Sequence, residues 1–368
     1  MLNANIDKGY SAWTMLKVLK IENFRGFQSF ELQNLGRVNL LVGENNSGKT
    51  SLLEAIYLLK NGVNLLPLYE LIQNRAEYLS GDPKTRPDLD IKLLFHQRRP
   101  QVEDYFLIES LTTDGSQELL RYSLQKTGSD FQQGTAGDLV ELYRGFSLVV
   151  NALSQANQEL EMPLNTEMGL PQKYIRQFAQ QSGFTQHQFV SSALAGSKNL
   201  NTLFDAIELT PKEDDLYEML RVIEPEIQRI APQRSHSGKF KVLLAGAEEP
   251  IPLRNLGGGV GHLLRLTLSL VNAAGGLLMV DDIDMGLHSS VMPDLWRLIW
   301  ETANKLDIQV FATTHSRDCW QSLAEIAAQE DTDGDDIRIH NIKKGAEQSA
   351  VLDNHKLAGI TKRRRKKS

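Results

Sequence analysis

The feature that most constrains the fold of this chain is a glycine loop, Gly43-Glu44-Asn45-Asn46-Ser47-Gly48-Lys49-Thr50. The loop matches in full the G-x-x-x-x-G-K-[ST] pattern that cradles nucleotide phosphates. Its glycines permit a tight turn in which successive backbone N–H groups point at phosphate oxygens. An apolar run at Val38–Val42 predicts a buried strand before the loop, and apolar residues at helical spacing predict a helix over Thr50–Lys60. A phosphate site requires strand, loop and helix in this order.

Chance is the alternative explanation of the loop, and the predicted strand and helix on either side argue against it. In such loops the lysine bridges the β- and γ-phosphates, and the threonine hydroxyl holds Mg²⁺. We therefore expect ATP and Mg²⁺ as cofactors, with Lys49 as a catalytic residue and Thr50 as a metal ligand. The whole loop and the following Ser51 are candidate nucleotide contacts.

Two carboxylates end an apolar strand that is predicted over Leu277–Asp282. In open α/β sheets, ligands bind at the carboxyl ends of the strands. We expect Asp281 to hold Mg²⁺ together with Thr50, and Asp282 to orient or deprotonate the attacking water. The alternative is a pair of aspartates that caps a helix from a turn.

A histidine follows the next predicted strand, Ile308–Thr313, in the stretch Thr313-Thr314-His315-Ser316. A histidine in this place can reach the γ-phosphate and report its presence, so His315 is a candidate catalytic residue. A lone histidine is more often structural. Here one helix and one strand separate it from Asp281, and the other two motifs favour the functional role.

With these motifs the chain resembles the ABC-type ATPases of the RecF, SMC and OLD group, and most of all the stand-alone OLD-like AAA ATPases of bacteria. Four segments carry the resemblance: Ile21–Phe27, Gly43–Thr50, Asp281–His288 and Thr313–Ser316. The resemblance implies an α/β P-loop NTPase fold of the ABC ATPase type. That fold has a mixed sheet with flanking helices, here with an inserted, largely helical lobe.

The resemblance further implies that ATP lies between two subunits, with a glycine-rich signature of one facing the phosphate loop of the other. The matching stretch is Asn255-Leu256-Gly257-Gly258-Gly259, which opens a helix predicted to end at Ala274. Its N–H groups suit a γ-phosphate held in trans, although three glycines before a helix can also be an ordinary loop. Nucleotide contacts are thus assigned to Asn255, Gly257, Gly259 and Arg25. The implied assembly is an ATP-dependent homodimer or higher oligomer.

Two residues depart from the family pattern. Asn255 stands where the signature usually has serine, and Asp282 stands where a glutamate is usual. Asparagine can still hydrogen-bond a phosphate oxygen. The Asp282 carboxylate, however, sits on the order of 1 Å further back, and a displacement of that size can cost about a hundredfold in rate. We therefore expect slow hydrolysis. A glutamine that senses the γ-phosphate is also implied within the lobe, with several candidates.

The motifs divide the chain into five stretches: residues 1–14, 15–60, 61–250, 251–345 and 346–368. We predict a flexible leader, the first part of the ATPase core, an inserted lobe of strands and then helices, the second part of the core, and a basic tail. In the lobe, strands are expected over Asp90–Phe95, Phe106–Leu111 and Leu119–Leu124. Lobe helices are expected over Leu139–Leu160, Gln172–Gln181, Asn201–Leu209 and Lys212–Arg229. The second core part adds a helix over Val291–Lys305 and a strand over Ile337–Ile342.

Composition excludes several classes of protein. Cys319 is the single cysteine, so the chain has neither a disulfide framework nor a thiolate metal site. No apolar run approaches the roughly 20 residues of a membrane span, and we expect a cytoplasmic protein without a membrane partner. The net charge of −6 argues against a surface covered in nucleic acid, but not against a local basic groove.

Two functions fit these features, and a third fits them less well. An ATP-driven enzyme acting on DNA, in repair or phage defence, would use the core and the basic tail. Too few residues follow His315 for a nuclease domain, so a nuclease or other effector would be a separate partner. The alternative is a nucleotide-gated switch that regulates an effector with little turnover, and slow hydrolysis favours it. A transporter subunit is disfavoured by the long insert and the Phe24-Arg25-Gly26-Phe27 segment.

Overall fold

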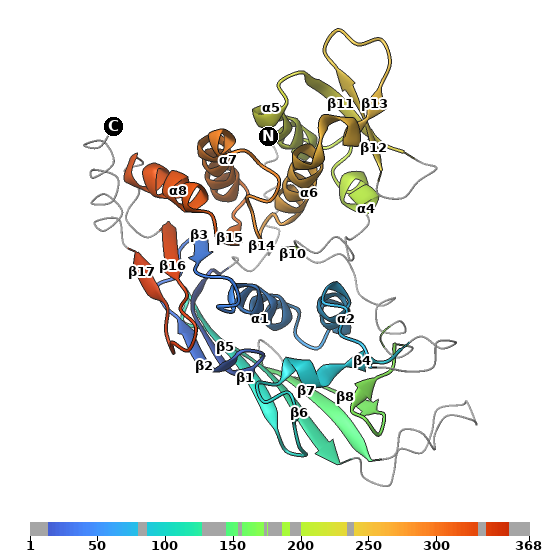
Figure 1. The fold of residues 1–368 in the computed structure, drawn as a ribbon, viewed down its shortest axis with the longest axis vertical. Helices are drawn as coiled ribbons and strands as arrows, with labels where there is room; N and C mark the ends of the chain where they lie inside the picture. The colour runs from blue at the N-terminus through green and yellow to red at the C-terminus, as the bar shows by residue number, and fades with distance from the viewer. Residues whose placement is uncertain are drawn as a thin grey trace, which may run out of the picture.

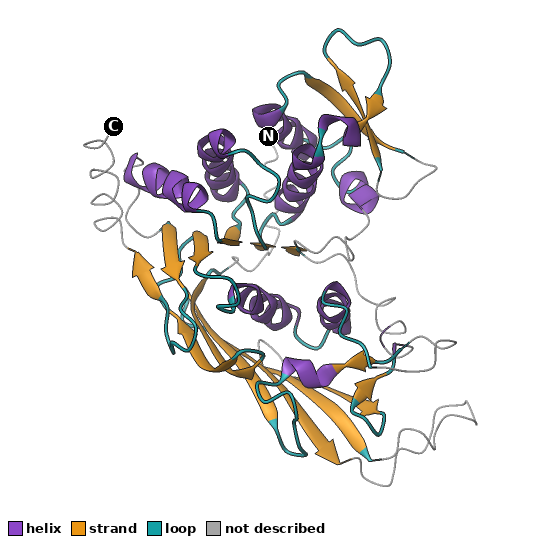
Figure 2. Ribbon diagram, in the orientation of Figure 1, coloured by secondary structure: helices purple, strands orange, loops and turns teal. Residues whose placement is uncertain are grey.

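The computed structural model describes residues 14–79, 87–126, 145–153, 157–172, 175, 186–191, 200–233, 239–329 and 336–352. Two six-stranded sheets dominate this part of the chain (Figures 1 and 2). Helices lie between the sheets and on the outer face of one of them. The layers are therefore helices, a mostly parallel sheet, a second helical layer and an antiparallel sheet.

The mostly parallel sheet carries the phosphate loop. Its strand order is β10-β14-β15-β3-β16-β17, in which β17 pairs antiparallel with β16 and the other described pairs are parallel. Every residue of β3, β14 and β15 is buried, as expected for strands covered on both faces. The bounds are His187–Val190 (β10), Leu277–Val280 (β14), Gln309–Thr314 (β15), Val38–Val42 (β3), Ile337–Asn341 (β16) and Ala350–Leu352 (β17).

The antiparallel sheet has the order β2-β1-β5-β6-β7-β8. Its strands are Phe27–Leu32 (β2), Leu16–Phe24 (β1), Tyr105–Thr112 (β5), Gln117–Lys126 (β6), Phe146–Leu153 (β7) and Asn157–Leu164 (β8). A smaller sheet joins β11 (Ile227–Pro232), β12 (Phe240–Leu244) and β13 (Ile251–Pro252), and β4 (Leu89–Asp90) pairs with β9 (Gly169–Leu170).

Helices cover both faces of the mostly parallel sheet (Figure 1). Between the sheets lie α1 (Lys49–Asn61) and α2 (Leu65–Asn74). The other face is covered by α5 (Lys212–Ile223), α6 (Gly258–Asn272), α7 (Met292–Lys305) and α8 (Arg317–Gln329). The short helices are α4 (Leu200–Asp205) and the 3₁₀ turns η1 (Ile91–Leu94), η3 (Leu253–Leu256) and η4 (Ser289–Val291).

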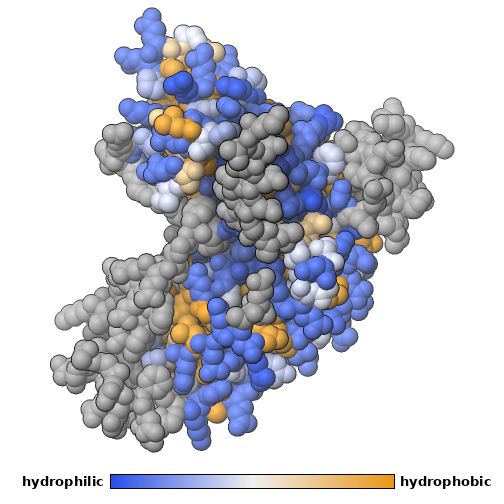
Figure 3. Space-filling model, turned by 180° about the vertical axis from the view of Figure 1, so that it is seen from behind, coloured by the Kyte–Doolittle hydropathy of each residue, from blue (hydrophilic) through white to orange (hydrophobic). Residues whose placement is uncertain are grey.

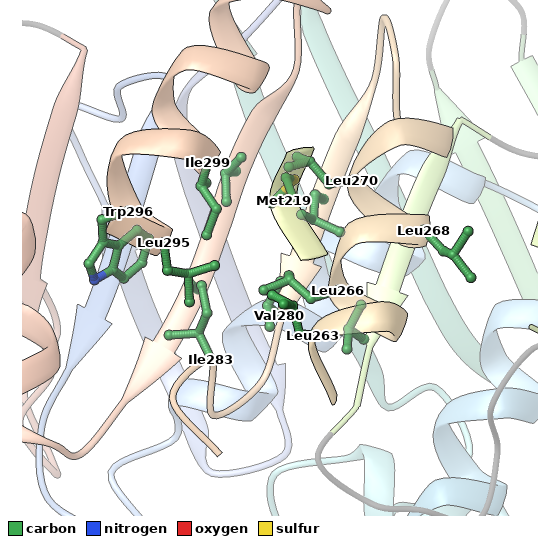
Figure 4. Close-up of a cluster of buried hydrophobic side chains, with 14 of the residues drawn as sticks. Met219, Leu263, Leu266, Leu268, Leu270, Val280, Ile283, Leu295, Trp296 and Ile299 are labelled. Carbon is green, nitrogen blue, oxygen red and sulfur yellow. The ribbon is translucent and has the colours of Figure 1, made fainter. Parts of the chain in front are cut away.

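The layers enclose two hydrophobic cores. Leu278 and Val280 of β14 belong to the core under α5–α8, whereas Leu277 and Met279 belong to the core around α1 and α2. Figure 4 shows Val280 within the first of these clusters, together with side chains of α6 and α7. On the face drawn in Figure 3, hydrophilic residues dominate the described surface. Alternation along the strands thus sends apolar side chains into both cores.

The α/β P-loop fold is confirmed, with its mixed sheet and flanking helices. Among the described residues of the inserted lobe, however, strands predominate over helices, contrary to the expectation of a largely helical lobe. In place of a helix over Leu139–Leu160, the described residues form β7 and β8. The reason is tertiary: β7 pairs with β6 from Phe146 to Leu153, which overrides the local spacing of apolar residues. The boundaries of the five stretches stay a prediction.

Two other lobe elements differ from expectation, and a third lies largely outside the described residues. The stretch Asp90–Phe95 is largely the 3₁₀ turn η1. Helix α5 ends at Ile223 rather than Arg229, because Pro225 disfavours helical conformation in the residue before it and β11 follows. Most of Gln172–Gln181 lies outside the described residues, as do residues 1–13 of the leader and 353–368 of the tail.

No helix in the described ranges has the length and apolarity that crossing a bilayer requires.

A buried glutamine joins the two large sheets. Gln309, at the start of β15, is 0% exposed. Its amide nitrogen donates to the Leu16 and Gly36 carbonyls at 2.9 and 2.8 Å, and its amide oxygen accepts from the Leu16 N–H at 2.8 Å. One side chain therefore satisfies three buried backbone groups where β1 meets the other sheet.

We expect Gln309→Leu to lower the free energy of unfolding by roughly 2–4 kcal/mol, because it removes the buried side-chain partner of the Leu16 N–H and carbonyl. The Gly36 carbonyl keeps its hydrogen bond from the Asn39 amide at 2.7 Å. Urea unfolding followed by circular dichroism measures the loss. The matched control is Gln117→Leu, an exposed position on β6, which we expect to change stability by less than about 0.5 kcal/mol. Equal stability of the two variants would contradict the joining role of Gln309.

Candidate nucleotide-binding site

The glycines of the phosphate loop are required by close approaches of the chain. Gly48 has φ +99°, and a Cβ there would collide with the Phe27 ring. A Cβ on Gly43 would collide with the Ile342 carbonyl oxygen. Glu44, Asn45 and Asn46 form the exposed tip of the loop. The loop therefore lies directly between the end of β16 and the start of β2, and α1 begins at its last two residues.

Lys49 lies across this loop. Its ammonium donates to the carbonyl oxygens of Gly43 and Glu44 at 2.8 and 2.9 Å. Burial lowers the pKa of Lys49, while Asp282 and Asp281 oppose the shift. A largely buried cation near two carboxylates, at the base of a loop of this type, is suited to polyphosphate.

Thr50 and Asp281 meet as the sequence predicts. The Thr50 hydroxyl donates to Asp281 Oδ1 at 2.9 Å, and the Thr313 hydroxyl donates to the same oxygen at 2.8 Å. Asp281 is 5% exposed. A hydroxyl beside a buried carboxylate is the hard-oxygen pair that Mg²⁺ accepts from a protein while it keeps waters and phosphate oxygens as further ligands. The residues present therefore fit the implied metal ion.

Asp282 and His315 form a second pair beside the first. His315 Nδ1 lies 3.6 Å from Asp282 Oδ1, and the backbone N–H of Asp282 donates to the Thr313 hydroxyl at 2.8 Å. Burial raises the pKa of the Asp282 carboxyl, with a further rise from Asp281, and His315 opposes it. Asp282 also has φ +52°, a left-handed conformation that costs a side-chain-bearing residue energy. A carboxyl with a raised pKa is a better proton acceptor than an ordinary one.

Arg25 stands in the wall of a pocket beside the loop. Its side chain is 5% exposed and pairs with Glu54 of α1 at 2.6 Å and with Glu77 at 2.7 Å. Arg75 contacts the other oxygen of Glu54 at 2.6 Å. Sequence reasoning missed Glu54, Glu77 and Arg75, because nothing in the local pattern says that α1 and the end of α2 meet at Arg25.

This pocket has a volume of about 980 Å³, and it is lined by Asn46, Ser47, Gly48 and Ser51 together with Arg25 and Arg75. The Ser47 hydroxyl and the Nη2 of Arg25 are buried and have no hydrogen-bond partner in the described structure. Both are groups that phosphate or ribose oxygens could satisfy. The donors and the volume fit a nucleotide.

The signature lies elsewhere in the same chain. Asn255 and Gly257 are exposed where η3 passes into α6, and Gly257 has φ +94°. A separate pocket of about 500 Å³ opens here, lined by Gly257 and Gly258 and by Arg254 and Arg265. It shares no lining residue with the pocket at the phosphate loop. The structure thus brings together Lys49, Thr50, Asp281, Asp282 and His315, but not the signature.

The implied γ-phosphate glutamine stays unassigned. The strand beside Asp281 is β10, whose Val190 carbonyl accepts the Asp281 N–H at 2.8 Å. Serine, not glutamine, follows β10 at position 191, and Gln188 is buried within the strand. The four residues of β10, His187–Val190, are too few and too mixed in polarity to predict a strand from sequence.

We expect Asp282→Asn to stabilise the fold at neutral pH. The raised pKa means that the ionised carboxyl is less favourable in the folded than in the unfolded chain, and asparagine removes that charge and tolerates positive φ. The melting temperature at pH 7.5 should rise by about 2 °C. The gain should shrink as the pH falls through the raised pKa and disappear below the ordinary value of 3.8, where the wild-type carboxyl is protonated in both states. A lower melting temperature at pH 7.5 would contradict this reading of the Asp282 environment.

Comparison with known proteins identifies a family and several similar proteins. Residues 38–318 match the family described as "AAA domain, putative AbiEii toxin, Type IV TA system". A Helicobacter pylori protein named ATP/GTP phosphatase is 24% identical over 353 residues, which cover 86% of this chain and 90% of that protein. The DNA replication and repair protein RecF of Clostridioides difficile is 49% identical over 47 residues, 13% of each chain. The SMC head domain of Thermotoga maritima superposes with a TM-score of 0.43 at 13% identity, covering 92% of this chain and 98% of that one.

The family match and the RecF matches confirm the resemblance to the RecF and SMC group of ABC-type ATPases. Because the family match spans more than half of the sequence, this chain belongs to the family described as "AAA domain, putative AbiEii toxin, Type IV TA system" and is a P-loop ATPase of the AAA type.

Proposed function

We propose that this chain hydrolyses ATP to ADP and phosphate, in a dimer whose two sites each combine the phosphate loop of one copy with the signature of the other. The observation that carries the chemistry is the convergence of two pairs, Thr50 with Asp281 and Asp282 with His315. The similar protein named ATP/GTP phosphatase, which aligns along most of this chain, supports the reaction type.

In this mechanism the loop N–H groups and the Lys49 ammonium bind the β- and γ-phosphate oxygens. Mg²⁺, held by Thr50 and Asp281, supplies charge neutralisation on the phosphates when bound. Asp282 orients a water and takes its proton as the water oxygen bonds to the γ-phosphorus. The bond from that phosphorus to the bridging oxygen breaks, and ADP leaves with both bonding electrons. His315 donates a hydrogen bond to a γ-phosphate oxygen and is held by Asp282.

The separation of the two pockets supports a dimer. Within one chain the signature does not line the pocket at the phosphate loop, although its N–H groups and helix end suit an anion. Asn255 and Gly257 are exposed and therefore free to meet a second copy. A head-to-head arrangement gives each signature a phosphate to bind and creates two equivalent sites, as a two-fold interface requires.

Mixing two inactive variants tests the composite site. Lys49→Ala removes the phosphate contact, and Asn255→Asp places a negative charge against the γ-phosphate of the second copy without removing a buried contact. Each variant alone should hydrolyse ATP at less than a tenth of the wild-type rate. An equal mixture should recover about a quarter of that rate, because half the dimers are mixed and each has one intact site of two. If the mixture is no more active than the two variants separately, the shared site is refuted.

A second variant tests the role of the shortened carboxylate. Asp282→Glu should increase kcat about tenfold or more, because the longer side chain advances the carboxylate by on the order of 1 Å towards the γ-phosphate. Phosphate release under saturating ATP measures kcat. A small loss of stability is expected, since glutamate tolerates positive φ less well than aspartate. An unchanged or lower rate would mean that Asp282 is not an impaired catalytic carboxylate.

The biological setting that we favour is DNA repair or phage defence in the cytoplasm, with any nuclease or effector supplied by a partner. The RecF relatives, which are named DNA replication and repair proteins, support the setting of DNA repair. The alternative is a nucleotide-gated switch, favoured by the short, strained Asp282. Stimulation of steady-state hydrolysis by DNA would exclude the switch. Dimerisation driven by ATP with almost no phosphate release would exclude the DNA-acting enzyme.

A further inference from the structure

The loop that carries Asp282, residues 281–288, is held from two sides; we call it the acidic loop. On one side β15 holds it. The Ile283 N–H donates to the Thr313 carbonyl at 3.0 Å, and the Thr314 hydroxyl donates to Asp284 at 2.7 Å. On the other side lies α6, the helix that begins at the signature. The contacts with β15 belong to the ATP site already described, whereas those with α6 have no role in it.

We propose that His262 and Gly259 are positioning residues that fasten the acidic loop to α6 and so place Asp282 for hydrolysis. The proposal rests on the proposed hydrolysis at Asp282. Neither residue needs to touch the nucleotide bound in its own chain, because both act through the backbone of the acidic loop.

The first fastening is a hydrogen bond from a buried histidine. His262 is 6% exposed, and its Nε2 lies 3.2 Å from the Ile283 carbonyl oxygen. A carbonyl oxygen only accepts, so Nε2 must carry the proton and donate it. Burial lowers the pKa of His262 and the positive charge of Arg265 adds to this, while the hydrogen bond to Ile283 and the charge of Asp284 oppose the shift. The ring therefore holds the carbonyl of Ile283, the residue next to Asp282, while Thr313 holds the N–H of the same residue.

The second fastening is a contact between two glycine backbones. A Cβ on Gly259 would lie 2.5 Å from the Gly286 carbonyl oxygen and 3.4 Å from a Leu287 methyl carbon. Gly286 itself has φ +72°. Neighbouring glycines of the helix differ, because a Cβ on Gly258 or Gly261 would meet nothing within 4 Å. Gly259 is thus the helix position at which any side chain must push the acidic loop away.

These two contacts connect the signature to the catalytic carboxylate. Gly259 lies in the signature and His262 lies one turn further along α6, while the other ends of both contacts lie within four residues of Asp282. A phosphate that docks on the signature from the second copy would therefore act on a helix already fixed to the acidic loop. Nucleotide binding at Lys49 and Thr50 depends on other elements, namely the phosphate loop and α1.

The test separates turnover from binding. We would measure kcat, the Kd for a non-hydrolysable ATP analogue and the melting temperature for His262→Leu, His262→Gln and Gly259→Ala in the full chain. His262→Leu and Gly259→Ala should lower kcat between about tenfold and a hundredfold, since a displacement of on the order of 1 Å has that effect. Kd should change less than about twofold. His262→Gln keeps a donor and should recover most of the rate.

Two control variants lie on the same helix. Thr267→Val removes a buried hydroxyl that has no hydrogen-bond partner, and Gly261→Ala adds a Cβ in open space. Both should keep the wild-type kcat. Equal slowing by the controls, or loss of binding together with turnover, would overturn the proposal, because α6 would then be sensitive to any change.

Wild-type rates in the His262→Leu and Gly259→Ala variants would also overturn the proposal, as would a slow His262→Gln. If His262→Leu does not fold, His262→Ala takes its place, because Gly259 is also assigned a contact with the nucleotide of the second copy. A wild-type protein that releases no phosphate would instead refute the proposed function, so the two failures are distinguishable.

Discussion

The register in which β14, β15 and β3 pair decides where each group of the candidate ATP site lies. Val280 is opposite Ala312, and Thr314 is opposite Val42. Because parallel strands end at the same edge, Asp281 leaves β14 beside Thr313 of β15, and Gly43 leaves β3 just beyond the pair of Val42 and Thr314. The hydrogen bonds from Thr50 and Thr313 to one oxygen of Asp281 then join α1, β14 and β15. A shift of β14 relative to β15 by one residue would move Asp281 away from Thr313 and Thr50. The apolar residues would stay buried, because both faces of these strands are covered.

The groups that follow these strands could be predicted from sequence, and the groups that approach from other parts of the chain could not. A short apolar run or a glycine motif lies next to each of the residues Lys49, Thr50, Asp281 and His315. Such a pattern indicates the end of a strand. Glu54 gives no such signal, because it occupies an ordinary position in a helix and acquires its role only when Arg25 and Arg75 meet it.

The fold shows the same limit. Hydrophobic period predicts strands β3, β14, β15 and β16 and helices α1, α6 and α7 of the core, whereas α8, β10 and β17 were not predicted. Strand β7 was not predicted either, since its apolar residues also fit a helix and only pairing with β6 decides between the two. Pro225 indicates in the sequence that α5 ends before Arg229, but the predicted helix ran past it. Strand pairing at a distance, rather than local preference, therefore determines the antiparallel sheet.

The site combines several unfavourable local features that the rest of the fold must offset. Arg25 and Glu54 are both almost fully buried ions, and desolvation of such a pair costs several kcal/mol before their attraction offsets it. Asp282 adds positive φ and a partly buried negative charge near Asp281. These features place a carboxylate of raised pKa, with little freedom to move, at the end of β14. A shorter side chain on a loop held from two sides cannot approach a phosphate by relaxing, so slow turnover would follow from the rigidity of the acidic loop as much as from the missing methylene.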